Sequence, residues 1–237
     1  LYSMLILINT ACHSRKSSTE KITDRVQNAV AEKEQKITSL LKLYKLKKDS
    51  LNVLFVAYKD NDQLDLYAKN SAEASYRKID SFAICKRSGK LGPKKAEGDK
   101  QVPEVFYHID RFNPQSLFHL SLGINYPNEL DKSLGRTGSD IFIHGKCETV
   151  GCLPMTDALI KEIYLYAAWA KDAGQVNIPV YIFPFAMTDE NLQQNKAHVD
   201  AETLLFWKNL QEGYQLFNIN NKELLFNVAA HSYNYIK

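Results

Sequence analysis

The sequence lacks the features that mark several broad classes of protein. It has no run near the roughly 20 apolar residues that a membrane-spanning helix needs, no internal repeat and no low-complexity tract. A net charge of +3 over 237 residues is too small to indicate a nucleic-acid partner. None of the four cysteines forms a CxxC pair, and four are too few for a disulfide scaffold of this length. The remaining composition, 45% hydrophobic and 24% charged, is typical of one globular domain, alone or with an appendage.

The first twelve residues, LYSMLILINTAC, contain a short apolar run that leads to small residues and a cysteine. The order of Leu5 to Ile8, Thr10, Ala11 and Cys12 is typical of the end of a bacterial lipoprotein signal, in which Cys12 carries the lipid. A plain secretory signal and an apolar first strand are the alternatives. We expect export to the periplasm or cell envelope, with membrane anchoring through Cys12 as one form of it.

Residues 19 to about 48 contain no proline or glycine, and their apolar side chains recur at steps of three or four. This pattern predicts an amphipathic helix or a pair of helices. The segment is either a spacer or membrane-surface helix, or a helix packed on the domain that follows. The expected divisions are a signal and tether at 1–18, a helical spacer at 19–50, the main domain at 51–220 and a C-terminal extension at 221–237.

The centre of the chain favours strands. Two β-rich runs, 52–58 and 64–69, flank a polar turn and predict a hairpin. Other short apolar runs predict strands at 82–86, 105–109, 118–122, 140–144 and 179–185. Helices are expected from the N-cap residue Thr156 as far as Gly174, and over about 189–214. The fold class is therefore α+β, mainly β with flanking helices.

The string HGKCETVGC, residues 144–152, places one histidine and two cysteines within nine positions. Zinc accepts these ligands, but a structural site needs four, and the fourth would have to come from Cys85 or a distant histidine. A disulfide between Cys147 and Cys152 would close a small loop in an exported protein. A cysteine nucleophile with a histidine base is the third interpretation, and it accounts for more of the string.

The nucleophile interpretation depends on the residues beside Cys152 and His144. A cysteine attacks as its thiolate, and its ordinary pKa of about 8.5 means that it needs a partner near neutrality. His144 ends a predicted strand before Gly145, so its imidazole would project from a rigid edge. Gly151 permits a tight turn in which its own N–H and that of Cys152 could form an oxyanion hole. Cys147 is the rival nucleophile, but no glycine precedes it, and we favour Cys152.

A longer pattern extends over five stretches in order. They are LGPKKAEGDKQVPEVFYHI at 91–109, HLSLGINYPNELD at 119–131, SDIFIHGKCETVGCLPMTD at 139–157, IPVYIFPFAMT at 178–188 and FWKNLQEGYQLF at 206–217. Over roughly residues 52–220 this pattern resembles the L,D-transpeptidase (YkuD-like) catalytic domain family, and within it the YafK-like branch. Members carry a strand ending in His-Gly and a later Ser/Thr-His-Gly-Cys, which correspond here to 144–145 and 149–152.

The resemblance implies a mainly β L,D-transpeptidase fold in which Cys152 is the nucleophile, His144 the general base, and Gly145 and Gly151 shape the site. It implies acyl transfer on peptidoglycan stem peptides through a thioester, in cell wall cross-linking or remodelling, with no cofactor and no metal. A hydrolytic L,D-carboxypeptidase or amidase, which releases a residue or a wall-attached protein from diaminopimelate, uses the same pair. An inactive wall-binding lipoprotein is the alternative from another class.

Two positions depart from the broader family. Val150 replaces the histidine that precedes Gly-Cys, and Pro154 stands where an arginine is common. A guanidinium that could bind a substrate carboxylate is therefore missing. The candidate substrate-binding residues are Tyr126, Asn125, Lys94 and His119, with Lys95 and Arg136 as further candidates for the missing cation.

Overall fold

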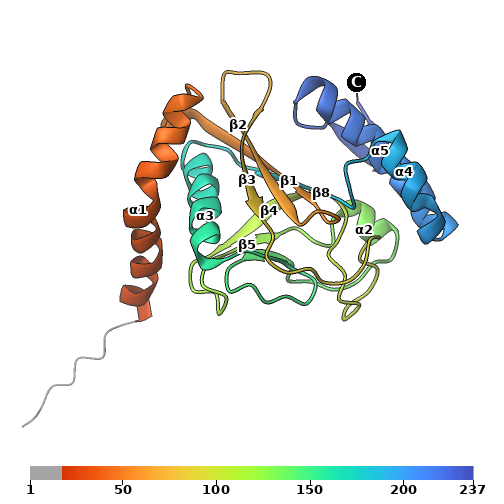
Figure 1. The fold of residues 1–237 in the computed structure, drawn as a ribbon, viewed down its shortest axis with the longest axis horizontal. Coiled ribbons are helices and arrows are strands. Elements are labelled where there is room, and N and C mark those ends of the chain that lie inside the picture. The colour runs from red at the N-terminus through yellow and green to blue at the C-terminus, as the bar shows by residue number, and fades with distance from the viewer. Residues whose placement is uncertain (1–17, 237) are drawn as a thin grey trace, which may run out of the picture.

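The structure is a computed structural model that describes residues 18–236, and side chains are described from residue 25 onward. The predicted export signal and the lipidation of Cys12 lie outside these residues. No helix in the described part of the chain is long and apolar enough to cross a membrane. Figure 1 shows a curled sheet with two helices beside one end and two others near the opposite end. These helices are α1 (Ser18–Leu43) and α3 (Asp157–Asp172), then α4 (Asp189–Asn195) and α5 (Ala201–Asn220).

The sheet has eight strands in the order β3-β2-β1-β8-β4-β5-β6-β7. They are β1 (Leu51–Tyr58), β2 (Gln63–Asn70), β3 (Arg77–Ala83), β4 (Val105–Asn113), β5 (Ser121–Ile124), β6 (Phe142–His144), β7 (Leu153–Pro154) and β8 (Pro179–Phe183). The pairs β1–β8 and β6–β7 are parallel, and the other pairs are antiparallel. The mainly β architecture with flanking helices is therefore confirmed.

The predicted hairpin is confirmed as β1 and β2, with Tyr58 opposite Gln63 across the polar turn. Strand β4 connects the two halves of the sheet, because residues 105–108 pair with β8 and the later residues pair with β5. The strand predicted at 118–122 begins only at Ser121, since His119 has a positive φ of 71° that is incompatible with an extended strand.

The helix predicted after Thr156 is confirmed as α3. The Thr156 side chain accepts a hydrogen bond from the Leu159 N–H, as an N-cap does. Helix α1 packs against α3. Of the two interpretations of this segment, the structure therefore agrees with a helix packed on the domain that follows. The buried carboxylate of Glu162 on α3 lies 2.9 Å from Lys33 Nζ and 2.6 Å from Lys36 Nζ on α1.

The single helix predicted over 189–214 is wrong, because the chain forms two helices there. Helix α4 runs on into the 3-10 helix η2 (Lys196–His198), and α5 begins anew. The Asp200 side chain accepts the Thr203 N–H, which caps the start of α5 and explains the break. The C-terminal hairpin of β9 (Phe226–Ala229) and β10 (Ser232–Tyr235) then packs against α5.

A buried polar cluster ties the loop before β4 to the core. Glu104, which is fully buried, accepts bonds from Lys59 Nζ and Trp207 Nε1, both at 2.8 Å. Lys59 Nζ also donates to the carbonyl oxygens of Gly92 at 2.8 Å and Val102 at 2.9 Å. These bonds hold the loop between β3 and β4 against the residue that follows β1 and against α5.

Candidate active site

A disulfide joins the segment after β3 to the loop between β6 and β7. Cys85 and Cys147 are 62 residues apart, and their Cα atoms are separated by 5.5 Å. The Cys85 N–H donates to Pro154 O at 2.9 Å, and the Cys147 N–H donates to Met155 O at 3.2 Å. The backbone carbonyls of two consecutive residues, Pro154 and Met155, therefore hold both cysteines in place. Cys152 is the free cysteine in the described part of the chain.

This pairing corrects alternatives that the sequence left open. A disulfide between Cys147 and Cys152 is wrong, because Cys147 is bonded to Cys85. The zinc site is wrong as well, since an oxidised Cys147 has no thiolate to donate. Among the described residues, no cluster of three or more His, Cys, Asp or Glu side chains could hold a metal ion. The disulfide also removes Cys147 as a nucleophile.

His144 is the last residue of β6, and only 3% of its surface is exposed. Its Nδ1 lies 2.7 Å from the carbonyl oxygen of Gly145. A carbonyl only accepts, so Nδ1 carries the proton and Nε2 is the basic nitrogen. Burial lowers the pKa of His144, and the contact with Gly145 opposes that shift. The imidazole is therefore neutral near pH 7, which is the form that a general base requires.

Gly145 allows a close approach of two loops. A Cβ at this position would lie 2.6 Å from Asp157 Oδ1 and 2.8 Å from Phe118 O. The Gly145 N–H donates to Phe118 O at 3.0 Å, and the Phe118 ring packs against His144 with its centroid 4.7 Å from that of the imidazole. A side chain at 145 would therefore force Asp157 or the backbone at Phe118 to shift.

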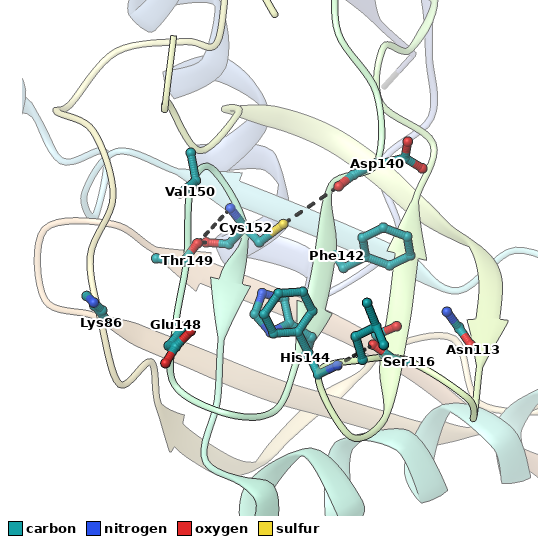
Figure 2. A pocket seen from close by; sticks show the side chains of 13 residues that line it. Lys86, Asn113, Ser116, Asp140, Phe142, His144, Glu148, Thr149, Val150 and Cys152 are labelled. Atoms are coloured by element: carbon teal, nitrogen blue, oxygen red, sulfur yellow. Dashed lines mark hydrogen bonds between the residues drawn. The ribbon is translucent and has the colours of Figure 1, made fainter. Parts of the chain in front are cut away.

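Cys152 directly precedes β7, whose parallel register places Pro154 opposite His144. Side chains alternate along a strand, so Cys152 and His144 face the same side of the sheet. Figure 2 shows both side chains at one cavity. Burial raises the pKa of the Cys152 thiol, and its Sγ lies 3.7 Å from Asp140 O. The resting site thus contains a neutral thiol and a neutral imidazole.

The N–H groups of Gly151 and Cys152 lie in one turn, as the oxyanion-hole hypothesis expects, but hydroxyls already bind them. Gly151 N–H donates to Ser88 Oγ at 3.0 Å, and Cys152 N–H donates to Thr149 Oγ1 at 2.9 Å. The Thr149 hydroxyl donates in turn to Cys152 O at 2.9 Å. Gly151 has a φ of 93°, which favours glycine. A substrate carbonyl would have to replace these hydroxyls.

The cavity beside Cys152 and His144 has a volume of about 630 Å³. Its walls combine apolar side chains with three charged ones (Figure 2). The lining residues are Lys86, Asn113, Ser116, Leu117, Phe118, Ser121, Asp140, Phe142, His144, Glu148, Thr149, Val150 and Cys152. Val150 stands at the family's histidine position and is 71% exposed. Lys86 is the one lysine or arginine among the described lining residues.

Asn125 and Tyr126, which the sequence suggested for substrate binding, do not line this cavity. The Asn125 side-chain oxygen accepts the His108 N–H at 2.9 Å. Tyr126 is buried, and its hydroxyl donates to Thr137 O at 3.0 Å. Both side chains hold the turn after β5, and the structure gives them packing and hydrogen-bonding partners in place of access to the thiol.

Lys94 and His119 also lie outside the cavity. Lys94 is buried and ion-paired with Asp99 at 2.7 Å, and it lines a neighbouring cavity of about 150 Å³. The Cβ of His119 packs behind Gly145, and its Nε2 has no hydrogen-bond partner among the described residues. The other two candidate cations, Lys95 and Arg136, are ion-paired with Glu202 and Asp131.

Sequence reasoning missed several residues that line the cavity, among them Lys86, Glu148 and Phe118. Phe118 covers the imidazole, and the two charged residues lie in the wall. One signal was available for the charged pair, because each directly follows a cysteine. That signal becomes informative only once the Cys85–Cys147 pairing is known.

Comparison with known proteins gives one group of sequence relatives. The chain is 36% identical over 187 residues to the protein named "Putative L,D-transpeptidase YafK" of Escherichia coli strain K12, which covers 78% of this chain and 74% of the relative. The protein of the same name from strain O157:H7 matches equally well. No family model matches the chain.

Solved structures give weaker likenesses. The helical cell shape determining protein Pgp2 of Campylobacter jejuni has a TM-score of 0.47 at 19% identity, over 76% of this chain and 74% of that one. L,D-transpeptidase 1 of Mycobacterium tuberculosis has a TM-score of 0.30 at 12% identity, over 56% of this chain and 62% of that one. The sequence relationship is the stronger finding, and by its identity and coverage the chain belongs to the L,D-transpeptidase family, in the branch of YafK.

Proposed function

We propose that this chain is a cysteine acyltransferase that acts on peptidoglycan stem peptides through a thioester on Cys152. One observation carries the proposal: the free thiol of Cys152 and the imidazole of His144 line the same cavity, with the basic Nε2 of His144 free of the Gly145 contact. Membership of the L,D-transpeptidase family supports peptidoglycan as the substrate class.

The first step is attack on the carbonyl carbon of a diaminopimelate residue in the stem. Because burial keeps Cys152 protonated at rest, the thiol gives its proton to His144 Nε2 as Sγ forms its bond to carbon. The bond from that carbon to the next amine then breaks. The leaving amine takes the proton from His144, and the acyl group remains on Cys152 as a thioester.

The second step reverses these transfers with a new nucleophile. His144 removes a proton from an acceptor amine or from water, the nucleophile displaces Sγ, and the thiol regains a proton. An amine gives a new cross-link, whereas water releases the acyl group and makes the enzyme an L,D-carboxypeptidase or amidase. The same two side chains serve both outcomes, so the acceptor that reaches the cavity decides between them.

The proposal places the protein outside the cytoplasm. A disulfide between cysteines 62 residues apart persists in oxidising compartments such as the periplasm, and peptidoglycan lies there too. Export through the N-terminal signal, with lipidation at Cys12, would anchor the domain close to the wall. Radiolabelled palmitate incorporated into the wild type but absent from Cys12→Ala would support the anchor, and equal labelling would exclude it.

Product analysis tests the activity. The protein is incubated with purified muropeptides beside its Cys152→Ala variant, and the products are identified by mass. New cross-linked or trimmed muropeptides formed only by the wild type are expected. If the folded wild type changes no stem peptide but still binds sacculi, the acyltransferase proposal fails and the inactive wall-binding protein replaces it.

A further inference from the structure

Two oppositely charged side chains in the cavity wall have no ion-pair or hydrogen-bond partner among the residues that the structure describes. Lys86 and Glu148 both line the cavity, and both are solvent-exposed. Among the described residues, neither side chain forms an ion pair or hydrogen bond, either with the other or with a third residue. Asp140, the third charged lining residue, is bonded to Arg111 at 2.8 Å and to Ser139 at 2.9 Å. Lys86 and Glu148 are therefore the charges that the fold leaves available to a ligand.

The disulfide joins the two backbone segments that carry these residues. Lys86 directly follows Cys85, and Glu148 directly follows Cys147. Because the two cysteine Cα atoms are 5.5 Å apart, the backbone segments that carry the charges are held together at this point. In Figure 2 both side chains lie on the side of His144 that faces away from Asp140. A covalent bond thus maintains a positive and a negative group along one wall.

A positive and a negative side chain that lie on the same side of one cavity, and are not bonded to each other, match a ligand that itself carries both charges. The free end of a diaminopimelate side chain has an ammonium and a carboxylate on one carbon, joined by a short methylene chain to the carbon beside the reacting carbonyl. Apolar side chains such as Phe118 and Val150 line the same cavity and could pack against those methylenes.

We propose that Lys86 and Glu148 form a binding subsite for this zwitterionic end, with Lys86 on the carboxylate and Glu148 on the ammonium. The subsite rests on the proposed function, since it orients the substrate of that reaction. It also supplies a cation for the substrate carboxylate, which Lys94, Lys95 and Arg136 cannot do while paired with carboxylates of the protein. A lysine binds a carboxylate as a point charge, without the bidentate geometry of arginine.

The test asks whether Lys86 recognises the side-chain carboxylate of the substrate and whether Glu148 recognises its ammonium. Three donor tetrapeptides are compared: one with unmodified diaminopimelate, one amidated at the side-chain carboxylate and one acetylated at the side-chain amine. Steady-state kinetics are measured for the wild type, Lys86→Met and Glu148→Gln. The control is Lys146→Met, because Lys146 is exposed on the same loop but does not line the cavity.

Charge-assisted contacts of this kind predict that Lys86→Met raises KM for the unmodified donor about 10-fold, with kcat changed less than about 2-fold. The same variant should leave KM for the amidated donor at the wild-type value, because the partner of Lys86 is already gone. Glu148→Gln should show the matching pattern with the acetylated donor. Lys146→Met should match the wild type on all three donors.

Equal effects of Lys86→Met on the unmodified and amidated donors would overturn the subsite, as would a wild type that does not distinguish the three donors. Both results require an active wild-type enzyme. An inactive wild type on every donor refutes the proposed function instead, so the two failures are separate. Circular dichroism and thermal unfolding of each variant confirm that a change in KM does not come from misfolding.

Discussion

Strands β1 and β8 in the middle of the sheet and strands β6 and β7 at its edge are stabilised by different interactions. The central pair is almost entirely buried, and its side chains are mainly apolar. The edge strands have three and two residues, and the loop between them is held by a disulfide and by hydrogen bonds to side chains. Hydrophobic burial tolerates many apolar sequences, whereas the edge depends on particular residues. The residues proposed for catalysis lie in the part of the sheet that is held by the disulfide and by individual side-chain hydrogen bonds.

The largest effect is expected from a substitution in the edge strands, and it should be a loss of turnover. Replacing the base, His144→Gln, should lower kcat by up to about 10⁴-fold, because proton transfer from Cys152 then lacks an acceptor. The unfolding free energy should fall by only about 1–2 kcal/mol, since one side-chain hydrogen bond and the packing against Phe118 are involved. Single-turnover kinetics and urea unfolding measure the two quantities. A large loss of stability with normal turnover would contradict the proposed difference between the edge strands and the central strands.

In the body of the sheet the largest effect should be on stability. Lys59→Met removes the cationic partner of Glu104, whose side chain is fully buried, and leaves an uncompensated charge that costs about 3–5 kcal/mol of unfolding free energy. Arg77→Met is the matched control, because Arg77 and Glu73 are an exposed pair with an expected contribution below about 1 kcal/mol. Similar unfolding midpoints for the two variants would show that the buried cluster is not important.

Loss of the disulfide should affect both the stability of the protein and its kinetics. The double variant Cys85→Ser with Cys147→Ser should lose about 2–4 kcal/mol of unfolding free energy through the wider freedom of the unfolded chain. It should also raise KM for the unmodified donor as Lys86→Met does, because the two charged segments separate. Urea unfolding and steady-state kinetics test both parts. A stable variant with unchanged KM would show that β7 alone holds the loop.

The smallest effect concerns pH. Protonated His144 cannot accept the Cys152 proton, so kcat/KM should fall as pH decreases through the pKa of His144. Burial lowers that pKa from its ordinary 6.5, and the acid limb should therefore lie below pH 6.5. Burial raises the pKa of Cys152, so iodoacetamide should alkylate it slowly at neutral pH and faster as pH rises. Rapid alkylation at pH 6 would instead indicate a preformed thiolate.

Much of the scaffold could be predicted from local patterns. The hairpin of β1 and β2 follows from two apolar runs around a polar turn, and α3 follows from Thr156 and a helical period. The break between α4 and α5 was missed, because the capping by Asp200 interrupts a region that is otherwise helical in pattern. The helix period alone does not show which polar residue turns back to cap the backbone.

The residues proposed for catalysis come from one short stretch of the sequence, whereas several residues that line the cavity beside them were not named from the sequence. His144, Gly145, Gly151 and Cys152 belong to one short string, and they meet at one strand edge in the structure. Lys86 comes from a segment far away in the chain, and its place in the same cavity wall as Glu148 depends on a disulfide across 62 residues. Such long-range pairing leaves no periodic trace in the sequence, so the cysteine nearer in the chain was the more obvious partner for Cys147.

Intact-protein mass spectrometry of an acid-quenched reaction tests the central claim most directly. After incubation with a donor tetrapeptide, the wild type should gain the mass of the acyl group, and peptide mapping should place it on the fragment that contains Cys152. His144→Gln should accumulate this adduct more slowly, and Cys152→Ala should show none. Turnover that persists in Cys152→Ala, or an adduct on any other residue, would contradict the account.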